Sequence, residues 1–300
     1  MPYLLLHTAD ALNQADLALL SRLSFAYALF RLEELEGQTL LRPLPRLTTA
    51  FVGEELGTML KYGGKTNELF TRLLLNLAVY AGGFADATEF RLLDPVAGKG
   101  TTLFEGLAAG YDVYGVEIGP DAVQESAAYL KKYLENGRYK HTLEKRRVGV
   151  AGQKHAAMLH EFTIARTKED AKQGRQHTCC MVAGDAQQVA HYFKSNHFHA
   201  IVGDLPYGVK HGNVSNRQQS ALTRNPAELL KACLPGWRTC LKPGGTLVLS
   251  WNRFVLGREE LQALLTDSGL EVLTASPFDR FAHRVDNAIW RDVVVARKPK

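Results

Sequence analysis

The sequence has 300 residues, 46% of them hydrophobic, and a formal net charge of +5, which suits one large domain with a small appendage. No apolar run reaches the roughly 18 residues of a membrane-spanning helix, and the first residues lack the basic region and cleavage site of a secretory signal. The four cysteines lack metal-ligand spacing, so we expect no metal site, and their scarcity suits a reducing cytoplasm. We therefore expect a cytoplasmic protein with no membrane partner.

The first 50 residues are predicted to form a small separate unit. Residues 1–8 are apolar enough for a short strand, and Leu and Ala recur at helical spacing between residues 10 and 35. Pro43 and Pro45 cannot continue a helix and end this pattern. We expect residues 1–50 to be an α/β appendage that assists substrate recognition.

A regular alternation of strands and helices follows over residues 51–300. Short apolar segments that end in turns or acids are typical of buried strands, and the amphipathic segments between them are typical of helices. The last two apolar segments are joined by a loop, which indicates antiparallel pairing. The pattern predicts a doubly wound, mostly parallel, seven-stranded α/β sheet. The predicted strands are 91–94, 112–118, 179–185, 198–204, 246–251, 270–276 and 288–298; the predicted helices are 68–81, one ending at 110, 120–136 and 258–267.

Positive charge is concentrated between residues 138 and 177. This stretch holds ten basic and four acidic residues, a net charge of +6 that leaves −1 for the rest of the chain. It lies in a connection far longer than usual, so we expect an insertion, with a short amphipathic helix at 155–165. Such a stretch is either a surface that attracts a polyanion or a solvated face. Its basic residues are Arg138, Lys140, Lys145, Arg146, Arg147, Lys154, Arg166, Lys168, Lys172 and Arg175.

Three cofactor types compete for the turn DPVAGKGTT, residues 94–102. A phosphate-binding P-loop needs Ser or Thr directly after the lysine, but Gly100 follows Lys99. A dinucleotide fingerprint needs a third glycine, where this chain has Leu103. The third type is a nucleoside cofactor without a pyrophosphate, such as S-adenosylmethionine.

S-adenosylmethionine uses more of this turn than its competitors do. Gly98 and Gly100 allow close backbone approach. Asp94 can accept from the ammonium group, and the helix N-terminus near Thr101 and Thr102 can bind the carboxylate. A tight turn without a ligand would explain the glycines but not Asp94.

Acidic residues end the following strands. Glu117 suits ribose hydroxyls, although nicotinamide enzymes share this feature. Asp185 suits either an adenine amine or the cap of a helix. Because the carboxyl ends of parallel strands share one edge, we expect Asp94, Glu117, Asp185 and Asp204 on one rim.

The segment DLPYG, residues 204–208, separates methyl transfer from hydride transfer. The lone pair of an exocyclic base amine is delocalised into the ring, and two acceptors aimed at its hydrogens make that lone pair available. The Asp204 carboxylate and the Leu205 carbonyl supply two acceptors, and the Pro206 ring restricts their linkage. Tyr207 can stack on the base. In isolation the segment is equally compatible with a turn and rim packing.

DPVAGKGT with a downstream DLPYG resembles the S-adenosylmethionine-dependent amino-methyltransferases, most closely the RNA guanine-N2 branch often joined to a THUMP RNA-binding domain. The resemblance covers about residues 62–298 and implies a Rossmann-like methyltransferase domain over 51–300 that methylates guanine N2, with tRNA as the favoured partner. It also places the segment 61–70 at the methionine end of the cofactor. The implied cofactor residues are Thr66, Asn67, Asp94, Pro95, Ala97, Gly98, Gly100, Thr101, Thr102, Glu117, Ile118, Asp185 and Ala186.

Two departures from the family bear on the substrate. Leu205 stands where the commoner form has proline; leucine occurs in part of the RNA branch, which favours RNA over DNA. The 50-residue unit is too short for a full THUMP domain. RNA contact is therefore expected from that unit, from the basic stretch or from the loop 208–226, which is otherwise a solvated lid. The loop carries Lys210, His211, Arg217 and Arg224 beside the catalytic rim.

Other functions stay open at this point. A DNA adenine-N6 or cytosine-N4 methyltransferase would use the same chemistry. A nicotinamide oxidoreductase and a non-catalytic RNA-binding relative fit the sequence less well, since both leave DLPYG or the acidic residues without a role. The sequence does not indicate an oligomeric state.

Overall fold

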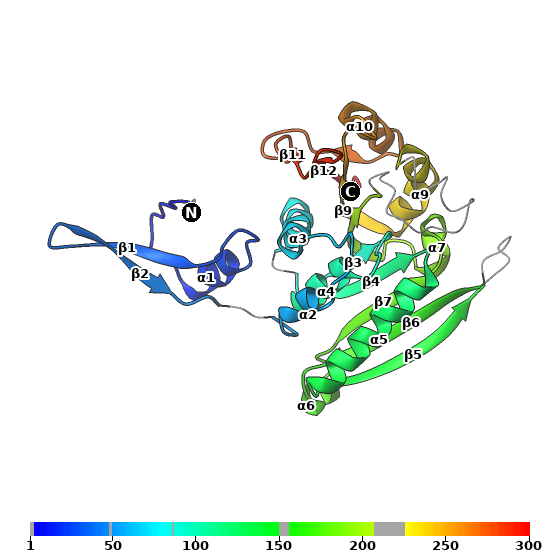
Figure 1. The fold of residues 1–300 in the computed structure, drawn as a ribbon, viewed down its shortest axis with the longest axis horizontal. Coiled ribbons are helices and arrows are strands. Elements are labelled where there is room, and N and C mark those ends of the chain that lie inside the picture. Colours follow the sequence, from blue (N-terminus) through cyan, green and yellow to red (C-terminus); the bar gives the residue numbers. More distant parts are fainter. Residues whose placement is uncertain (1–2, 48–49, 86, 150–155, 207–225) are drawn as a thin grey trace. The chain divides into compact units, whose positions relative to one another are not determined.

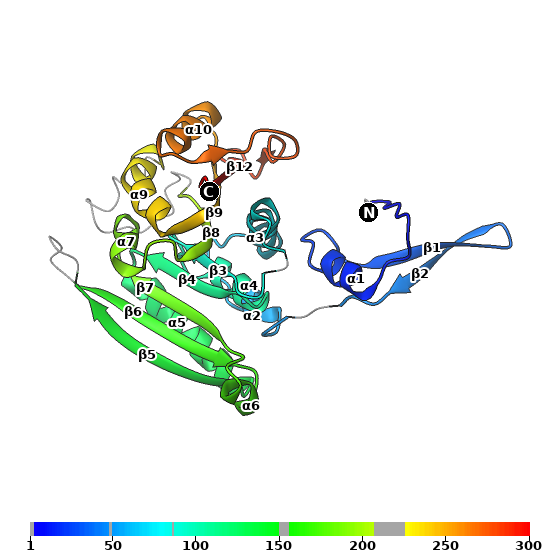
Figure 2. The same cartoon turned by 180° about the vertical axis from the view of Figure 1, so that it is seen from behind.

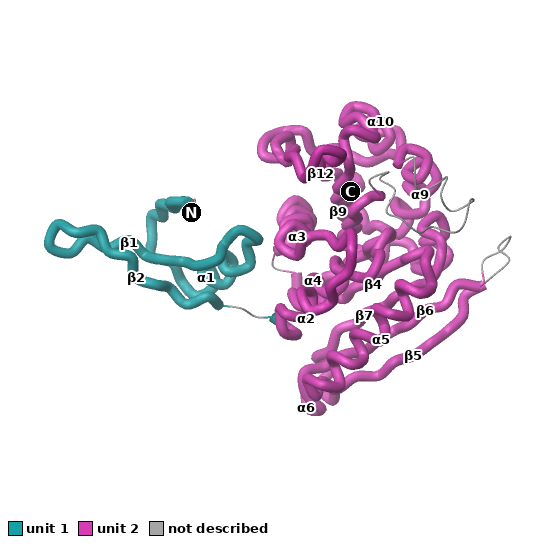
Figure 3. Tube along the Cα trace, viewed as in Figure 1, with its two compact units in different colours: residues 1–50 teal, residues 51–300 magenta. Residues whose placement is uncertain are grey.

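A computed structural model describes residues 3–47, 50–85, 87–149, 156–206 and 226–300 and divides the chain into two compact units, residues 1–50 and 51–300 (Figure 3). The smaller unit consists of one helix, α1 (Gln14–Ser21), and one hairpin, β1 (Leu29–Leu35) with β2 (Gln38–Leu44).

The expected strand at 1–8 is wrong for residues 3–8, and the helix expected over 10–35 is confirmed only for Gln14–Ser21. Residues 3–8 form no strand, and α1 stops at Ser21. Asn13 begins the helix with a capping box, in which its side chain accepts from the backbone of Asp16 and the Asp16 carboxylate accepts from the backbone of Asn13. Glu36 and Gly37, both with positive φ, then form a two-residue turn that makes a hairpin of a leucine-rich segment with helix-like spacing.

The larger unit is built on one sheet with the strand order β10-β12-β9-β8-β3-β4-β7-β6-β5, and β11 pairs with β12 (Figure 1). The seven consecutive strands from β10 to β7 in this spatial order are those predicted. The five from β7 to β9 are parallel, and β12 lies antiparallel to both of its neighbours β9 and β10. The doubly wound α/β fold and the antiparallel end are therefore confirmed.

Helices lie on both faces of this sheet (Figure 2), and each face packs against them in its own apolar core. The first contains α2 to α5, and the second contains α7, α9 and α10. The strands are β3 Arg91–Asp94, β4 Asp112–Glu117, β5 Lys140–Val148, β6 Ala157–Ala165, β7 His177–Ala183, β8 Phe198–Asp204, β9 Leu241–Asn252, β10 Glu271–Val272, β11 His283–Arg284 and β12 Trp290–Arg297. The helices are α2 Glu55–Met59, α3 Glu68–Gly82, α4 Thr101–Ala108, α5 Pro120–Asn136, α6 Lys168–Lys172, η1 Ala186–Gln188, α7 Val189–Tyr192, α9 Pro226–Cys240 and α10 Arg258–Asp267.

The basic stretch, residues 138–177, adds the strands β5 and β6 to the sheet and contains the short helix α6. The helix expected at 155–165 is wrong, because residues 157–165 form the strand β6, which pairs with β7 on one side and β5 on the other. Leu159, Phe162 and Ile164 of this strand are fully buried. Because apolar residues of β6 are buried on both faces of the sheet, their spacing in the sequence resembles that of a helix.

Candidate active site

The carboxyl ends of the adjacent parallel strands β4, β3 and β8 form one rim of the sheet. Asp94 ends β3, Glu117 ends β4 and Asp204 ends β8, while Asp185 follows β7 beside them. The four acids from separate strands thus lie along one edge of the sheet, where ligands of such folds bind.

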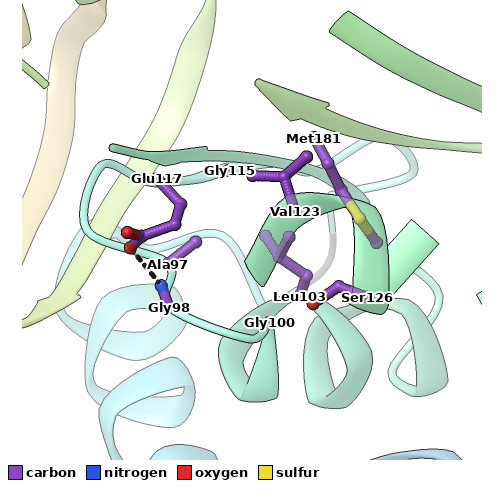
Figure 4. A pocket seen from close by; sticks show the side chains of 9 residues that line it. All are labelled: Ala97, Gly98, Gly100, Leu103, Gly115, Glu117, Val123, Ser126 and Met181. Carbon is purple, nitrogen blue, oxygen red and sulfur yellow. Dashed lines mark hydrogen bonds between the residues drawn. The ribbon is translucent and has the colours of Figure 1, made fainter. Parts of the chain in front are cut away.

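The turn between β3 and α4 depends on two glycines in the left-handed region. Gly98 has φ of 52° and Gly100, which caps α4, has φ of 88°. Ala97 N donates to Val116 O at 2.9 Å and fixes the turn against β4. A small pocket opens between the turn and β4 (Figure 4). It is lined by Ala97, Gly98, Gly100, Leu103, Gly115, Glu117, Val123, Ser126 and Met181.

Glu117 is held in place by two backbone groups. Its Oε2 accepts from Gly98 N at 3.0 Å (Figure 4), and its Oε1 accepts from Gly119 N at 2.8 Å. A carboxylate oxygen has two lone pairs, so each retains capacity for one more donor. The side chain is therefore oriented to receive two further hydroxyl groups.

Asp94 is 3% exposed, and burial raises the pKa of its carboxyl to about 7. The Thr102 hydroxyl and the backbone N–H of Val96, which donates to Asp94 Oδ1 at 3.0 Å, oppose this shift. The nearby charges of Asp204 and Glu117 add to it. A buried carboxylate with this environment favours a cation beside it.

Asp204 has a hydroxyl donor on each carboxylate oxygen. Thr66 Oγ1 donates to Oδ2 at 2.6 Å, and Ser250 Oγ donates to Oδ1. Ser250 lies opposite Asp204 in the β8–β9 register and is fully buried, and its carbonyl accepts from Leu205 N at 2.9 Å. The carboxylate is thus oriented from two separate segments of the chain.

The segment 61–70 links the turn to Asp204. Tyr62 shares a 2.9 Å hydrogen bond with the Thr101 hydroxyl, and Lys99 Nζ lies 5.4 Å from the centre of the Tyr62 ring. Asn67 caps α3, since its Oδ1 accepts from the next helical N–H groups at 2.9 and 3.1 Å. Of the two residues expected at the cofactor, Thr66 therefore touches Asp204 and Asn67 orders the helix behind it.

The remaining expected residues divide into three groups. Asp185 uses Oδ1 as the cap of η1, accepting from Gln187 N at 2.9 Å, which is the alternative role that its position suggested. Pro95, Ile118 and Ala186 follow the ends of β3, β4 and β7, and Ile118 is 44% exposed. Tyr207, Lys210, His211, Arg217 and Arg224 lie outside the described residues.

Residues 71–250 match the family model of the RMKL-like methyltransferase domain. The chain belongs to this family. The RMKL-like domain transfers methyl groups, which decides against hydride transfer, and its cofactor is S-adenosylmethionine.

Solved structures similar to this RMKL-like domain are distant. TrmN from Thermus thermophilus is 17% identical over 90% of this chain and 60% of its own, with a TM-score of 0.43. The chain thus spans 60% of the TrmN length. Magnesium protoporphyrin IX methyltransferase from Synechocystis PCC 6803 is 13% identical over 79% and 86% of the two chains, with a TM-score of 0.45. The PH0226 protein from Pyrococcus horikoshii OT3 is 13% identical over 83% and 100%, with a TM-score of 0.44. No curated protein matches the sequence.

The residues of the rim fit S-adenosylmethionine. Asp94 is a buried carboxylate with no cation among its described partners, as an α-ammonium ligand requires. A Cβ at Gly98 would meet nothing within 4 Å, so the missing side chain leaves space at the turn. Glu117 has acceptor capacity for a ribose diol. When bound there, the cofactor supplies an electrophilic methyl group on its sulfonium.

Two site features escaped sequence reasoning. A Cβ on Gly115 would lie 2.6 Å from Leu103 Cδ1 and 2.9 Å from Ala97 Cβ, so β4 needs a glycine where the turn crosses it. Ser250 is a lone hydroxyl in the apolar run LVLSW, and its parallel register with Asp204 could be known only from the sheet.

Among the described residues, no group of three or more His, Cys, Asp or Glu side chains is arranged to hold a metal ion. No helix in the described ranges is both long and apolar enough to cross a bilayer.

Proposed function

We propose that the protein methylates an exocyclic amine of an RNA base, with guanine N2 in tRNA as the target. The observation that carries this proposal is the Asp204 carboxylate, oriented by Thr66 and Ser250 at the rim beside the cofactor turn. An oriented acceptor at that point serves an amine nucleophile, because it binds the N–H groups and directs the lone pair to the methyl group.

The chemistry assigned to the chain is hydrogen bonding and positioning. Asp204 accepts one N–H of the target amine and the Leu205 carbonyl accepts the other. The nitrogen forms a bond to the methyl carbon as the sulfur–carbon bond breaks, and the nitrogen then releases one proton. Thr66 and Ser250 act as positioning residues that hold Asp204. A base within a duplex would have to be flipped out to reach this rim, so a single-stranded or loosened site is favoured.

The position of positive charge supports a polyanionic substrate. In the register, Arg147 lies opposite Met158, and Met158 lies opposite Ala183 at the carboxyl end of β7. The exposed side chains of Lys145, Arg146 and Arg147 are therefore at the same end of the sheet as the acids of the rim. Basic groups at this end suit phosphates that flank a bound base.

The smaller unit is less suited to that role than β5. It carries four arginines and five acids, which leaves it slightly negative. We therefore assign phosphate contact to β5, and RNA rather than DNA on the basis of Leu205 in the motif. We propose in addition that residues 1–50 assist substrate recognition.

The experiment that tests the substrate class is transfer of labelled methyl groups from S-adenosylmethionine to total tRNA, ribosomal RNA and DNA, followed by nucleoside analysis. The proposal expects label in RNA, as N2-methylguanosine. Label in DNA alone, as N6-methyladenine or N4-methylcytosine, would overturn it in favour of the DNA amino-methyltransferase alternative.

A further inference from the structure

The smaller unit, residues 1–50, has no apolar core of its own. Of its described residues 3–47, only Ser21 is buried. Twelve of the twenty exposed large hydrophobic side chains in the described chain lie in this unit, although it is one sixth of the sequence. A two-stranded hairpin with one short helix is marginally stable in water. The unit therefore needs a partner surface.

One face of the hairpin concentrates this apolar surface. Phe30 and Leu32 of β1 lie opposite Pro43 and Leu41 of β2, so the four side chains share a face. Phe30, Leu32 and Leu41 are 51%, 48% and 62% exposed.

The two edges of the hairpin differ in their capacity to add a strand. The turn at Glu36 and Gly37 has φ of 51° and 77°, a two-residue turn whose flanking pair, Leu35 and Gln38, is hydrogen-bonded. Hydrogen-bonded and non-hydrogen-bonded pairs alternate along the ladder, so Phe30 and Pro43 form a non-hydrogen-bonded pair. The Pro43 nitrogen therefore points to the outer edge of β2, where it has no N–H to offer.

The outer edge of β1 has no such block. By the same alternation, the backbone N–H and C=O groups of Phe30, Leu32 and Glu34 point away from β2. Within the described residues, β1 pairs with β2 alone. An unpaired edge of this kind is a template for a further strand.

Within one copy Glu33 pairs with Arg31 and with Arg42, and a second antiparallel copy of β1, LFRLEEL, can extend this charge cluster. With a two-fold axis at Leu32, Arg31 faces the partner's Glu33. A shift of the axis to Arg31 or to Glu33 would set like charges opposite each other, which is destabilising. The axis at Leu32 also pairs the outward-pointing groups of Phe30 with those of the partner's Glu34.

We propose that this protein forms a dimer in which the β1 strands of two copies pair across a two-fold axis at Leu32. The result is a four-stranded sheet in the order β2-β1-β1-β2 that joins the two apolar faces. Pro43 then stands on both outer edges, so the assembly closes as a dimer and does not continue into a filament.

A cysteine pair tests the register directly. In the proposed sheet, residues 32 of the two copies form a hydrogen-bonded pair with Cα atoms roughly 5.5 Å apart, which a disulfide can bridge. Residues 41 are three strands apart, roughly 14 Å, which a disulfide cannot bridge. All four native cysteines are buried and free, so their background is low.

The full-length Leu32→Cys variant is expected to form a disulfide-linked dimer under mild oxidation, whereas the Leu41→Cys control, on the same face, stays monomeric in denaturing gels. Sedimentation of the unmodified protein is expected to give twice the monomer mass, and Leu32→Lys is expected to restore the monomer mass. A wild-type protein that is monomeric at all concentrations would overturn the proposal. Equal cross-linking of the two cysteine variants would also overturn it, and so would burial of the residue 32 thiol that occurs only when RNA is added.

Discussion

Replacement of Ser250 by alanine isolates the orientation of Asp204 from cofactor binding. The Ser250 hydroxyl is fully buried and donates to Asp204 Oδ1, and it does not line the pocket at the cofactor turn. The change removes one oxygen atom and leaves Thr66 as the remaining hydroxyl on the carboxylate. The Asp204 carboxylate then loses the donor that orients Oδ1, and the acceptor for the target amine is held less firmly in its direction.

The expected size of the effect follows from the hydrogen bond that is lost. A hydrogen bond to a charged group contributes about 1.5–3 kcal/mol. If that energy is realised in the transition state, kcat falls about 10- to 100-fold, since each tenfold corresponds to about 1.36 kcal/mol. The KM for S-adenosylmethionine is expected to stay unchanged, because Asp94 and Glu117 keep their partners.

Thr246 provides a matched control on the same strand. Its hydroxyl is also buried and donates to Ala78 O at 2.8 Å, away from Asp204. Thr246→Val removes that hydroxyl at a cost in folding free energy of about 1 kcal/mol, measured by urea unfolding. Steady-state methyl transfer should separate the two variants. Equal kcat values for Ser250→Ala and Thr246→Val would refute the positioning role.

Three further predictions concern the cofactor site and the basic strand. Burial raises the pKa of Asp94 to about 7, so this carboxyl ionises at lower pH in the unfolded state than in the native state. The free energy of unfolding of the cofactor-free protein should therefore fall as pH rises from about 4 to about 7. Asp94→Asn should remove that dependence in thermal unfolding between about pH 4 and about pH 7 and should weaken cofactor binding in calorimetry; an unchanged pH profile would contradict the assigned environment. Gly115→Ala should weaken cofactor binding at least about tenfold by displacing the turn, whereas Gly149→Ala, where a Cβ meets nothing within 4 Å, should not. Alanine at residues 145–147 should lower RNA affinity and should reduce the slope of log affinity against log salt concentration by up to about 2–3. Alanine at Lys168, Lys172 and Arg175, in and after α6 at the opposite end of β6, should change this slope little. Equal slopes for the two variants would argue against β5 as the phosphate contact.

The sequence was informative where local signals and burial agreed. The strands β3, β4 and β8 are apolar runs that end in an acid, and Arg258–Asp267 is a helix with the bounds that its pattern predicts. The strand β6 was missed because residues buried on both faces lose the period of two that marks a strand. The hairpin at residues 29–44 was missed because leucines in β1 and β2 imitate helical spacing.

Within the site, acids at strand ends were predictable because the topology alone brings them to one rim. The partners of those acids were not. Thr66 is 138 positions from Asp204 in sequence and Ser250 is 46 positions away, so their contacts depend on how α3 and β9 pack. Gly115 became meaningful only when the turn was seen to cross it.

The most direct test of the central claim is the nucleoside composition of tRNA after incubation with S-adenosylmethionine and either the wild-type protein or Asp204→Asn. Asparagine keeps the shape of the side chain but replaces one acceptor oxygen with a donor. We predict N2-methylguanosine with the wild-type protein and at least about a hundredfold less with the variant, at equal cofactor binding. Equal methylation by both proteins, or a product methylated on ring carbon or ribose, would contradict amine methylation at Asp204.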